Sequence, residues 1–189
     1  MLHWDGATWT IVSTPAGSTA ALYGVKAIAT NDVWAVGNLK AQTLTMHWDG
    51  ISWSIIPSPN VGQGSNILRS VDASGSDDVW AVGQSGQVGQ LSSLALHWDG
   101  TAWSSVPTAR ESDDMFSSVA IHSTDDVWAV GAVDGQPLAE RWNGTAWKVS
   151  PLPTVEPDAA LHSICVTRTG TLWSGGAQGA DQLFFERTR

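Results

Sequence analysis

A tryptophan-centred hexapeptide, Asp-Val-Trp-Ala-Val-Gly, recurs along the chain at a nearly constant interval. Its copies stand at residues 32–37, 78–83 and 126–131, with an altered fourth copy at 171–176. The copies are 46, 48 and 45 residues apart, measured from tryptophan to tryptophan. An interval of this length is typical of one four-stranded blade in a radially repeated β architecture. The chain is therefore predicted to be a repeat protein.

A second repeated element, His-Trp-Asp-Gly, lies between the hexapeptides. It occurs at residues 3–6, 47–50 and 97–100, and as Arg-Trp-Asn-Gly at 141–144. Another tryptophan always follows five residues after the first one. Asp-Gly supplies the positive φ angles that a tight hairpin turn needs, and the two tryptophans then lie on one face of the paired strands. Each copy is predicted to be a hairpin.

Each repeat is expected to contain four short antiparallel strands, here called a to d. In the second complete repeat they are Leu68–Ala73, Asp78–Gly83, Leu94–Trp98 and Trp103–Val106. Strand b is apolar on both faces, which requires cover on both sides and favours a β-propeller, where each blade lies between two neighbours. No capped apolar pattern of helical period is present, so an all-β fold is predicted.

The chain is expected to form one propeller domain of about four blades. Residues 21–57, 67–107 and 115–151 are predicted as blades, 160–189 as a partial blade, and 1–14 as strands c and d of a shared blade. This gives 17 strands, one more than four blades use, because Leu183–Arg187 competes with residues 1–4 for one position. Two architectures stay open, namely a closed four-bladed ring and an arc or fragment of a larger propeller.

The tryptophans are predicted to be structural. Each can remove on the order of 150–250 Å² from water. All twelve fall in a repeated register and are expected in the core: Trp4, Trp9, Trp34, Trp48, Trp53, Trp80, Trp98, Trp103, Trp128, Trp142, Trp147 and Trp173. Small residues mark the narrow centre of strand a, at Gly24, Ser70, Ser118 and Ser163. The single cysteine, Cys165, lies in an apolar stretch and is expected to be a packed thiol.

Composition excludes several classes of function. The formal net charge of −9 argues against nucleic acid and against anionic membrane surfaces, which both attract basic proteins. No apolar run approaches the length that a membrane helix needs. Residues 1–4 already belong to the repeat, so no leader sequence is expected there.

Repeat lengths vary in only two of the four connections. Strands c and d are always joined by the same turn, whereas the b–c and d–a connections differ in length from repeat to repeat. In an antiparallel blade these two connections lie at the same end, and binding sites are commonly built on variable loops. The candidate binding residues on this face are Asn38, Lys40, Gln84, Gln87, Gln90, Arg110, Glu111, Asp113, Asp114, Asp134, Gln136, Gln178 and Asp181. The alternative is that they are solvated loop residues.

No catalytic, metal-binding or cofactor-binding set is expected. The repeated aspartates are predicted to be structural: Asp32, Asp78 and Asp126 accept backbone hydrogen bonds between strands a and b, and Asp5, Asp49 and Asp99 begin the c–d turn. Calcium binding by them is the alternative. The repeated histidines stand on successive blades about 10 Å apart and cannot converge on one zinc ion.

Residues 68–107 carry both motifs, Val-Asp-Ala-Ser-Gly-Ser-Asp-Asp-Val-Trp-Ala-Val-Gly and Leu-His-Trp-Asp-Gly-Thr-Ala-Trp-Ser-Ser-Val-Pro. This stretch resembles the Trp-rich propeller repeats of long, often secreted bacterial proteins, which implies an extracellular location. The motifs are also similar to tectonin-type lectin propellers. Residues 167–173 resemble, more weakly, the Asp-box of sialidases, but without its aspartate.

The functional hypothesis is a non-enzymatic binding or scaffold module whose variable face binds a glycan or a protein partner. Two alternatives stay open, namely a glycoside-hydrolase-like (sialidase-type) propeller or its inactive remnant, and a purely structural repeat array. Self-association that completes a larger ring is a further expectation. No cofactor is implied.

Overall fold

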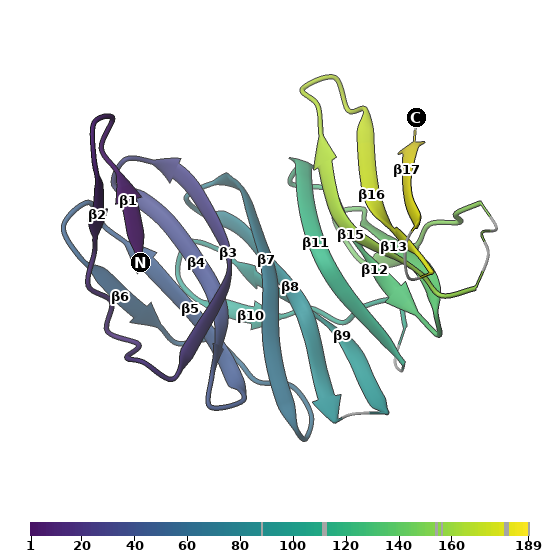
Figure 1. The fold of residues 1–189 in the computed structure, drawn as a ribbon, viewed down its shortest axis with the longest axis horizontal. Coiled ribbons are helices and arrows are strands. Elements are labelled where there is room, and N and C mark those ends of the chain that lie inside the picture. Colours follow the sequence, from purple (N-terminus) through teal and green to yellow (C-terminus); the bar gives the residue numbers. More distant parts are fainter. Residues whose placement is uncertain (88, 111–112, 154, 156, 180–181, 189) are drawn as a thin grey trace.

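The protein folds entirely into antiparallel β-sheets. The computed structural model describes residues 1–87, 89–110, 113–153, 155, 157–179 and 182–188, and side chains up to residue 179. These residues form 17 strands, as the repeat count predicted, and contain no helix that could span a membrane. Figure 1 shows the sheets following one another in chain order.

Three complete four-stranded blades make up the middle of the molecule. Within each blade the strands pair in sequence order. Blade 1 contains β3 (Ala20–Ala29), β4 (Asp32–Leu39), β5 (Gln42–Trp48) and β6 (Trp53–Ile56). Blade 2 contains β7 (Ser65–Gly75), β8 (Asp78–Gln87), β9 (Gln90–Trp98) and β10 (Trp103–Ser105). Blade 3 contains β11 (Asp114–Ser123), β12 (Asp126–Val133), β13 (Gln136–Trp142) and β14 (Trp147–Val149).

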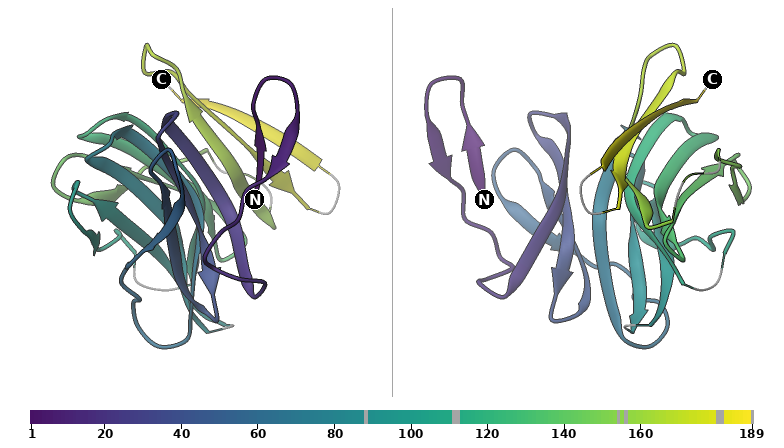
Figure 2. Two further views of the ribbon diagram at one scale, coloured as in Figure 1. Left: turned by 90° about the vertical axis from the view of Figure 1, so that its left-hand side faces the viewer. Right: turned by 45° about the vertical axis from the view of Figure 1, so that its right-hand side comes forward.

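Two smaller sheets flank the three blades. The first is the hairpin of β1 (Leu2–Trp4) and β2 (Trp9–Ile11). The second contains β15 (Ala159–Val166), β16 (Leu172–Gln178) and β17 (Gln182–Thr188). The hairpin does not join the β15–β17 sheet into one shared blade; β17 takes the place beside β16. The molecule is consequently an open arc, with these sheets at opposite ends (Figure 2).

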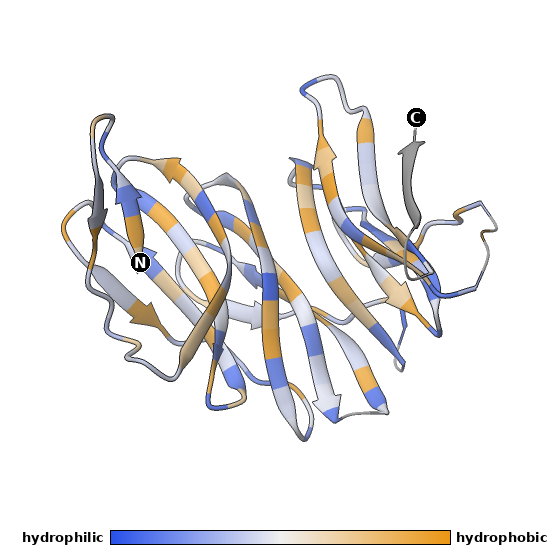
Figure 3. Cartoon of the chain, in the orientation of Figure 1, coloured by the Kyte–Doolittle hydropathy of each residue, from blue (hydrophilic) through white to orange (hydrophobic). Residues whose placement is uncertain are grey.

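The blades interlock through the repeated tryptophans. The Trp34 ring of β4 lies 5.0 Å from that of Trp98 and 5.2 Å from that of Trp103, both in the next blade. Trp80 repeats this arrangement with Trp142 and Trp147 of blade 3 at 5.1 and 5.2 Å. The hexapeptide tryptophans of blades 1 and 2 are thus inserted against the hairpin tryptophan pair of the following blade. Hydrophobic and hydrophilic residues alternate along the strands (Figure 3).

The tryptophan prediction is wrong at the two ends of the arc. Trp34 and Trp80 are 2% and 1% exposed, but Trp4, Trp9 and Trp173 are 47%, 66% and 46% exposed. These three lie on the flanking sheets, where no further blade covers them.

The predicted packed thiol of Cys165 is also wrong. The cysteine is exposed, since it lies on the outer face of the β15–β17 sheet.

Strand a of each repeat forms the inner edge of its sheet and contains a bulge. The partner register shifts between Leu22 and Gly24 in β3, and at the equivalent place in β7, β11 and β15. The final glycine of the hexapeptide lies directly against this region: a Cβ on Gly37 would overlap the carbonyl oxygen of Ala21. The same overlap arises at Gly83, Gly131 and Gly176, which explains why every copy ends in glycine.

The small residues of strand a do lie where neighbouring blades approach closely. A Cβ on Gly24 would come within 3.1 Å of the Ser70 backbone. Ser70 Oγ accepts a hydrogen bond from the Val119 N–H of the next blade at 3.2 Å, and Ser118 Oγ accepts one from Ile164 N–H at 3.2 Å. These serines therefore tie successive inner strands together.

Candidate functional site at the variable-loop end

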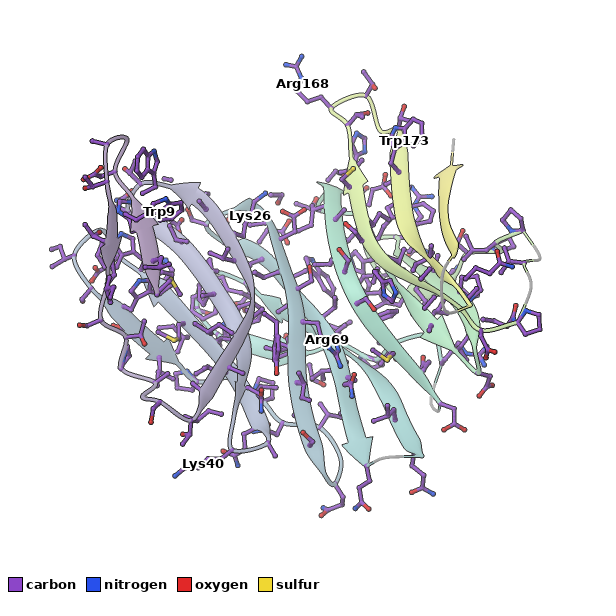
Figure 4. The ribbon with its side chains drawn as sticks, viewed as in Figure 1. Trp9, Lys26, Lys40, Arg69, Arg168 and Trp173 are labelled. Atoms are coloured by element: carbon purple, nitrogen blue, oxygen red, sulfur yellow. The ribbon has the colours of Figure 1, made fainter. Side chains whose placement is uncertain are left out.

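The variable connections meet at one end of the blades, as predicted. Asn66 N–H, at the start of β7, donates to the carbonyl of Ala41 in the β4–β5 turn at 2.8 Å. Ala159 N–H donates in the same way to Gly135 O at 3.0 Å. These bonds fasten the b–c turns of blades 1 and 3 to the beginning of the next sheet. Lys40 marks this end at the lower edge of Figure 4.

A groove of about 530 Å³ opens at this end of blade 2. Three connections line it: β6–β7 through residues 61–63, the β8–β9 hairpin, and the β10–β11 connection through residues 106–110. Three predicted binding residues, Gln87, Gln90 and Arg110, lie together on its wall and are exposed. Serine and threonine hydroxyls from the same strands complete a polar lining. We call this hollow the blade 2 groove.

A second, smaller hollow of about 280 Å³ lies between blades 2 and 3. Its lining includes three predicted residues, Asp113, Asp114 and Asp134, and we call it the acidic hollow. Asp113 and Asp134 are exposed, whereas Asp114 is 1% exposed. Gly89 of the β8–β9 turn also lines this hollow, so the same hairpin borders both depressions.

A buried acidic residue that the sequence reasoning missed supports the groove from below. Glu140 of β13 is 0% exposed; its Oε2 accepts a hydrogen bond from Ala109 N–H at 2.9 Å, and its Oε1 has no partner among the described residues. Burial, together with the nearby Asp114 charge, raises the pKa of this carboxyl to about 7. Its signal in the sequence is that a carboxylate replaces the equivalent apolar residues Met46 and Leu96.

Asp114 connects the acidic hollow to the groove. Its Oδ1 accepts a hydrogen bond from Ser93 N–H at 3.0 Å, and Ser93 lines the blade 2 groove. Asp114 Oδ2 and Ser93 Oγ are buried without a partner among the described side chains. Buried polar atoms of this kind normally find a partner, which includes ordered water.

The remaining predicted residues do not join either hollow. Gln84 is engaged inside the blade, where its Oε1 accepts hydrogen bonds from Arg69 Nε and Nη2 at 3.0 and 2.8 Å. Lys40 is exposed on the β4–β5 turn with a φ of 50°. Three others are half-buried on their own strands: Asn38, Gln136 and Gln178. Glu111 and Asp181 lie outside the described residues.

The aspartates of the c–d turns have the structural role that was predicted. Asp99 Oδ1 accepts hydrogen bonds from the Thr101 and Ala102 N–H groups at 2.8 and 2.9 Å and from the Thr101 hydroxyl. These bonds lower the pKa of Asp99 to about 2. Asp5 and Asp49 accept equivalent backbone bonds. Asn143 Oδ1 does the same in blade 3, so the turn needs the acceptor rather than the charge.

The aspartates at the start of strand b were predicted to accept hydrogen bonds from the backbone. This prediction is wrong, because their observed partners are side chains. Asp32 Oδ1 lies 2.8 Å from His47 Nε2, and Asp78 Oδ1 lies 2.8 Å from His97 Nε2. Asp126 Oδ1 accepts from Arg141 Nε and from the Trp128 indole at 2.7 and 2.8 Å. Side chains of strand c occupy these carboxylates because His and Arg pair directly across from the hexapeptide tryptophan.

The bulges place a second set of blade-specific residues along the inner edge. The unpaired residue of each bulge is Tyr23, Arg69, Ser117 or His162. Beside them Lys26 Nζ lies 2.6 Å from Asp72 Oδ1 of the next blade. Figure 4 shows Arg69 on β7 and Lys26 towards the opposite end from Lys40. Bulges commonly redirect side chains, but these residues line no hollow described for this chain.

No group of three or more histidine, cysteine or acidic residues in the described part of the chain could hold a metal ion. Two of the repeated histidines, His47 and His97, are instead engaged with aspartates and packed on tryptophans. The His47 ring lies 4.7 Å from that of Trp34, and the His97 ring 4.6 Å from that of Trp80.

Comparison with known proteins establishes the fold and no family. No family model and no curated protein matches the chain. Among solved structures, a chain of YCF48 bound to D1 peptide is similar over 95% of this chain, with a TM-score of 0.56 and 21% identity. A mutant Trypanosoma rangeli sialidase matches over 97% with a TM-score of 0.56 and 13% identity. The fold is a β-propeller.

A third neighbour, U3-55K, matches over 82% of the chain with a TM-score of 0.53 and 12% identity. The chain spans only part of the length of these neighbours: 57% of the YCF48 chain, 46% of U3-55K and 40% of the sialidase. These neighbours share the propeller architecture with this chain, and a shared fold does not by itself assign a function.

Proposed function

We propose that this chain is a non-enzymatic propeller module that binds an extended peptide segment of a protein partner in the blade 2 groove. One observation carries the proposal: three connections from different parts of the chain converge there on a polar hollow of about 530 Å³. Its volume lies within the range of small-ligand sites, and a peptide of a few residues fits such a space. The rigid blades hold the loops in place.

The lining suits the main chain of a peptide. Gln87 and Gln90 each offer an amide that can both donate and accept, and the neighbouring hydroxyls do the same. Arg110 supplies a cation at the rim, which favours a segment with a carboxylate. None of the described lining residues is aromatic, so the stacking surface that sugars commonly use is missing from this groove. The YCF48 neighbour was solved with a peptide, which supports the same class of ligand.

A glycan partner and a sialidase-type hydrolase remain the competing functions. A hydrolase needs two accessible carboxyl groups, one of which has a raised pKa. Glu140 has the raised pKa but is fully buried, whereas Asp113 and Asp134 are exposed. We therefore favour binding over hydrolysis for this end of the blades.

Selection from a displayed peptide library tests the proposal. We expect the wild-type chain to enrich related sequences, and Arg110→Ala or Gln87→Ala to weaken their binding roughly tenfold, about 1.4 kcal/mol. Lys40→Ala is the matched control, because Lys40 is exposed at the same end but lies outside the groove. Selected peptides that bind Arg110→Ala and Gln87→Ala as tightly as the wild type would contradict this binding site. Binding on a glycan array, or cleavage of a sialoside, without any peptide enrichment would replace the proposed function.

A further inference from the structure

The two ends of the arc carry different, complementary faces. The leading face is the side of blade 1 that is turned away from blade 2. Val25 lies on it and is 65% exposed, whereas its equivalents Val71, Val119 and Ile164 are 7%, 5% and 8% exposed because a preceding blade covers them. The trailing face is the outer side of the β15–β17 sheet. Trp9 near one end and Trp173 near the other are labelled in Figure 4.

The leading face contains an apolar groove of about 530 Å³. Its lining includes Val25, Ala27 and Val33 of β3 and β4, the hairpin pair Trp48 and Trp53, and residues 1–3. The Trp48 and Trp53 rings are 5.9 Å apart and tilted, as in the other hairpin pairs. The groove is thus built from the same parts that receive a tryptophan elsewhere in the chain.

Within the chain every complete blade contact has one design. The tryptophan pair of blade 2 receives Trp34, and that of blade 3 receives Trp80. Among the described residues, the Trp48–Trp53 pair receives no hexapeptide tryptophan. Met1 and Ala16 cover the Ala35, Leu44 and Met46 side chains of this face. The uncovered part of the leading face, around Val25 and the tryptophan pair, is therefore half of a blade contact.

The trailing face presents the other half. Trp173 occupies the hexapeptide position of β16 and is 46% exposed, compared with 1–2% for Trp34 and Trp80. Ser163 of β15 is exposed as well. Its equivalents Ser70 and Ser118 both accept a hydrogen bond from the next inner strand.

We propose that a second copy of this chain docks head to tail, its leading face on the trailing face of the first. Trp173 enters the groove beside Trp48 and Trp53 of the second copy, and Ser163 Oγ accepts a hydrogen bond from the Val25 N–H. This occupant follows from the repeat register, because one copy carries both halves of a contact that the chain already forms twice internally. Two such contacts close two arcs into one ring, which removes the exposed faces.

The proposal is independent of peptide binding, since the blade 2 groove lies on a middle blade and not on either end face.

Mass in solution tests the pairing. We expect light scattering to give twice the mass of one chain for the wild type, and the mass of one chain for Val25→Glu and for Trp173→Ser. Both substitutions affect exposed side chains, and circular dichroism will show whether each variant keeps its sheet content. Val149→Ser is the control, because Val149 is exposed on blade 3 away from both faces. A wild-type chain that stays monomeric at high micromolar concentration would overturn the proposal.

The single native cysteine gives a test of the register. Asp72 Oδ2 accepts a hydrogen bond from Ile121 N–H of the next blade at 2.8 Å, and Cys165 and Ala27 occupy the equivalent positions. Ala27→Cys should therefore form a disulfide with Cys165 of the second copy, giving a covalent dimer on a non-reducing gel. Val149→Cys should give none. A disulfide within one copy would mean closure of a single chain and would overturn the proposal, as would a dimer that does not cross-link.

Discussion

Glu140 provides the most quantitative prediction about the structure beneath the blade 2 groove. Its carboxyl is 0% exposed, and burial raises its pKa from 4.5 to about 7. Because the folded pKa lies above the unfolded value, this group contributes stability that is fully present below pH 4.5 and is lost as the pH rises through 7. The difference corresponds to about 3 kcal/mol of unfolding free energy.

Glu140→Gln isolates this contribution. Glutamine has nearly the same shape, can still accept the hydrogen bond from Ala109 N–H, and does not titrate. The variant should match the wild type in acid and become more stable than it above neutrality. A free-energy gain of about 3 kcal/mol raises the melting temperature of a domain of this size by roughly 6–12 °C.

Thermal unfolding of both proteins across this pH range is the assay. The quantity of interest is the difference between variant and wild type, because other titrating groups contribute equally to both. A difference that does not change with pH would show that Glu140 is ionised or solvated in the folded protein. A variant that is less stable at neutral pH would mean that the Glu140 charge has a partner, and would refute the reasoning.

Three further perturbations follow from the repeat geometry. Gly83→Ala should destabilise the protein by several kcal/mol, a large effect for a point mutation, because the added Cβ overlaps the Ile67 carbonyl. Gly75→Ala is the control and should cost little, because its Cβ meets only the Asp77 side chain at 3.2 Å. Denaturant titration measures both effects. Asp99→Asn should be nearly neutral and Asp99→Ala destabilising in thermal melts, since Asn143 makes the same turn bonds. Trp80→Ala should cost about 3–5 kcal/mol and Trp9→Ala far less, because the first tryptophan is buried between blades and the second is 66% exposed.

The repeat register was enough to predict most of the local structure. Position in the motif fixed the strand count, the hairpin pairing of residues such as Trp98 with Trp103, and the clustering of variable loops at one end. These features depend on local turn chemistry and on the alternation of side chains between the two faces of each strand, and both can be recognised in the sequence. The strands themselves run longer than predicted, as in β7 and β8, because hydrogen bonding continues past the apolar segment.

Features that depend on neighbouring sheets could not be predicted from the motif. Trp173 and Trp34 occupy equivalent positions, yet one is exposed and the other buried, since only Trp34 is followed by a complete blade. The convergence of Gln87, Gln90 and Arg110 likewise depends on how two blades are stacked. Glu140 could have been found by aligning the repeats, because it breaks an apolar position.

Chemical-shift mapping of a library-selected peptide tests the central claim most directly. Peptide binding in the blade 2 groove predicts backbone shift changes that cluster on residues 61–63, on the β8–β9 hairpin and on residues 106–110. They should be weakened by Arg110→Ala and unchanged by Lys40→Ala. The account would be contradicted if the groove residues showed no shift changes. The changes would then be confined to the inner edge around Arg69 and His162, or to the acidic hollow.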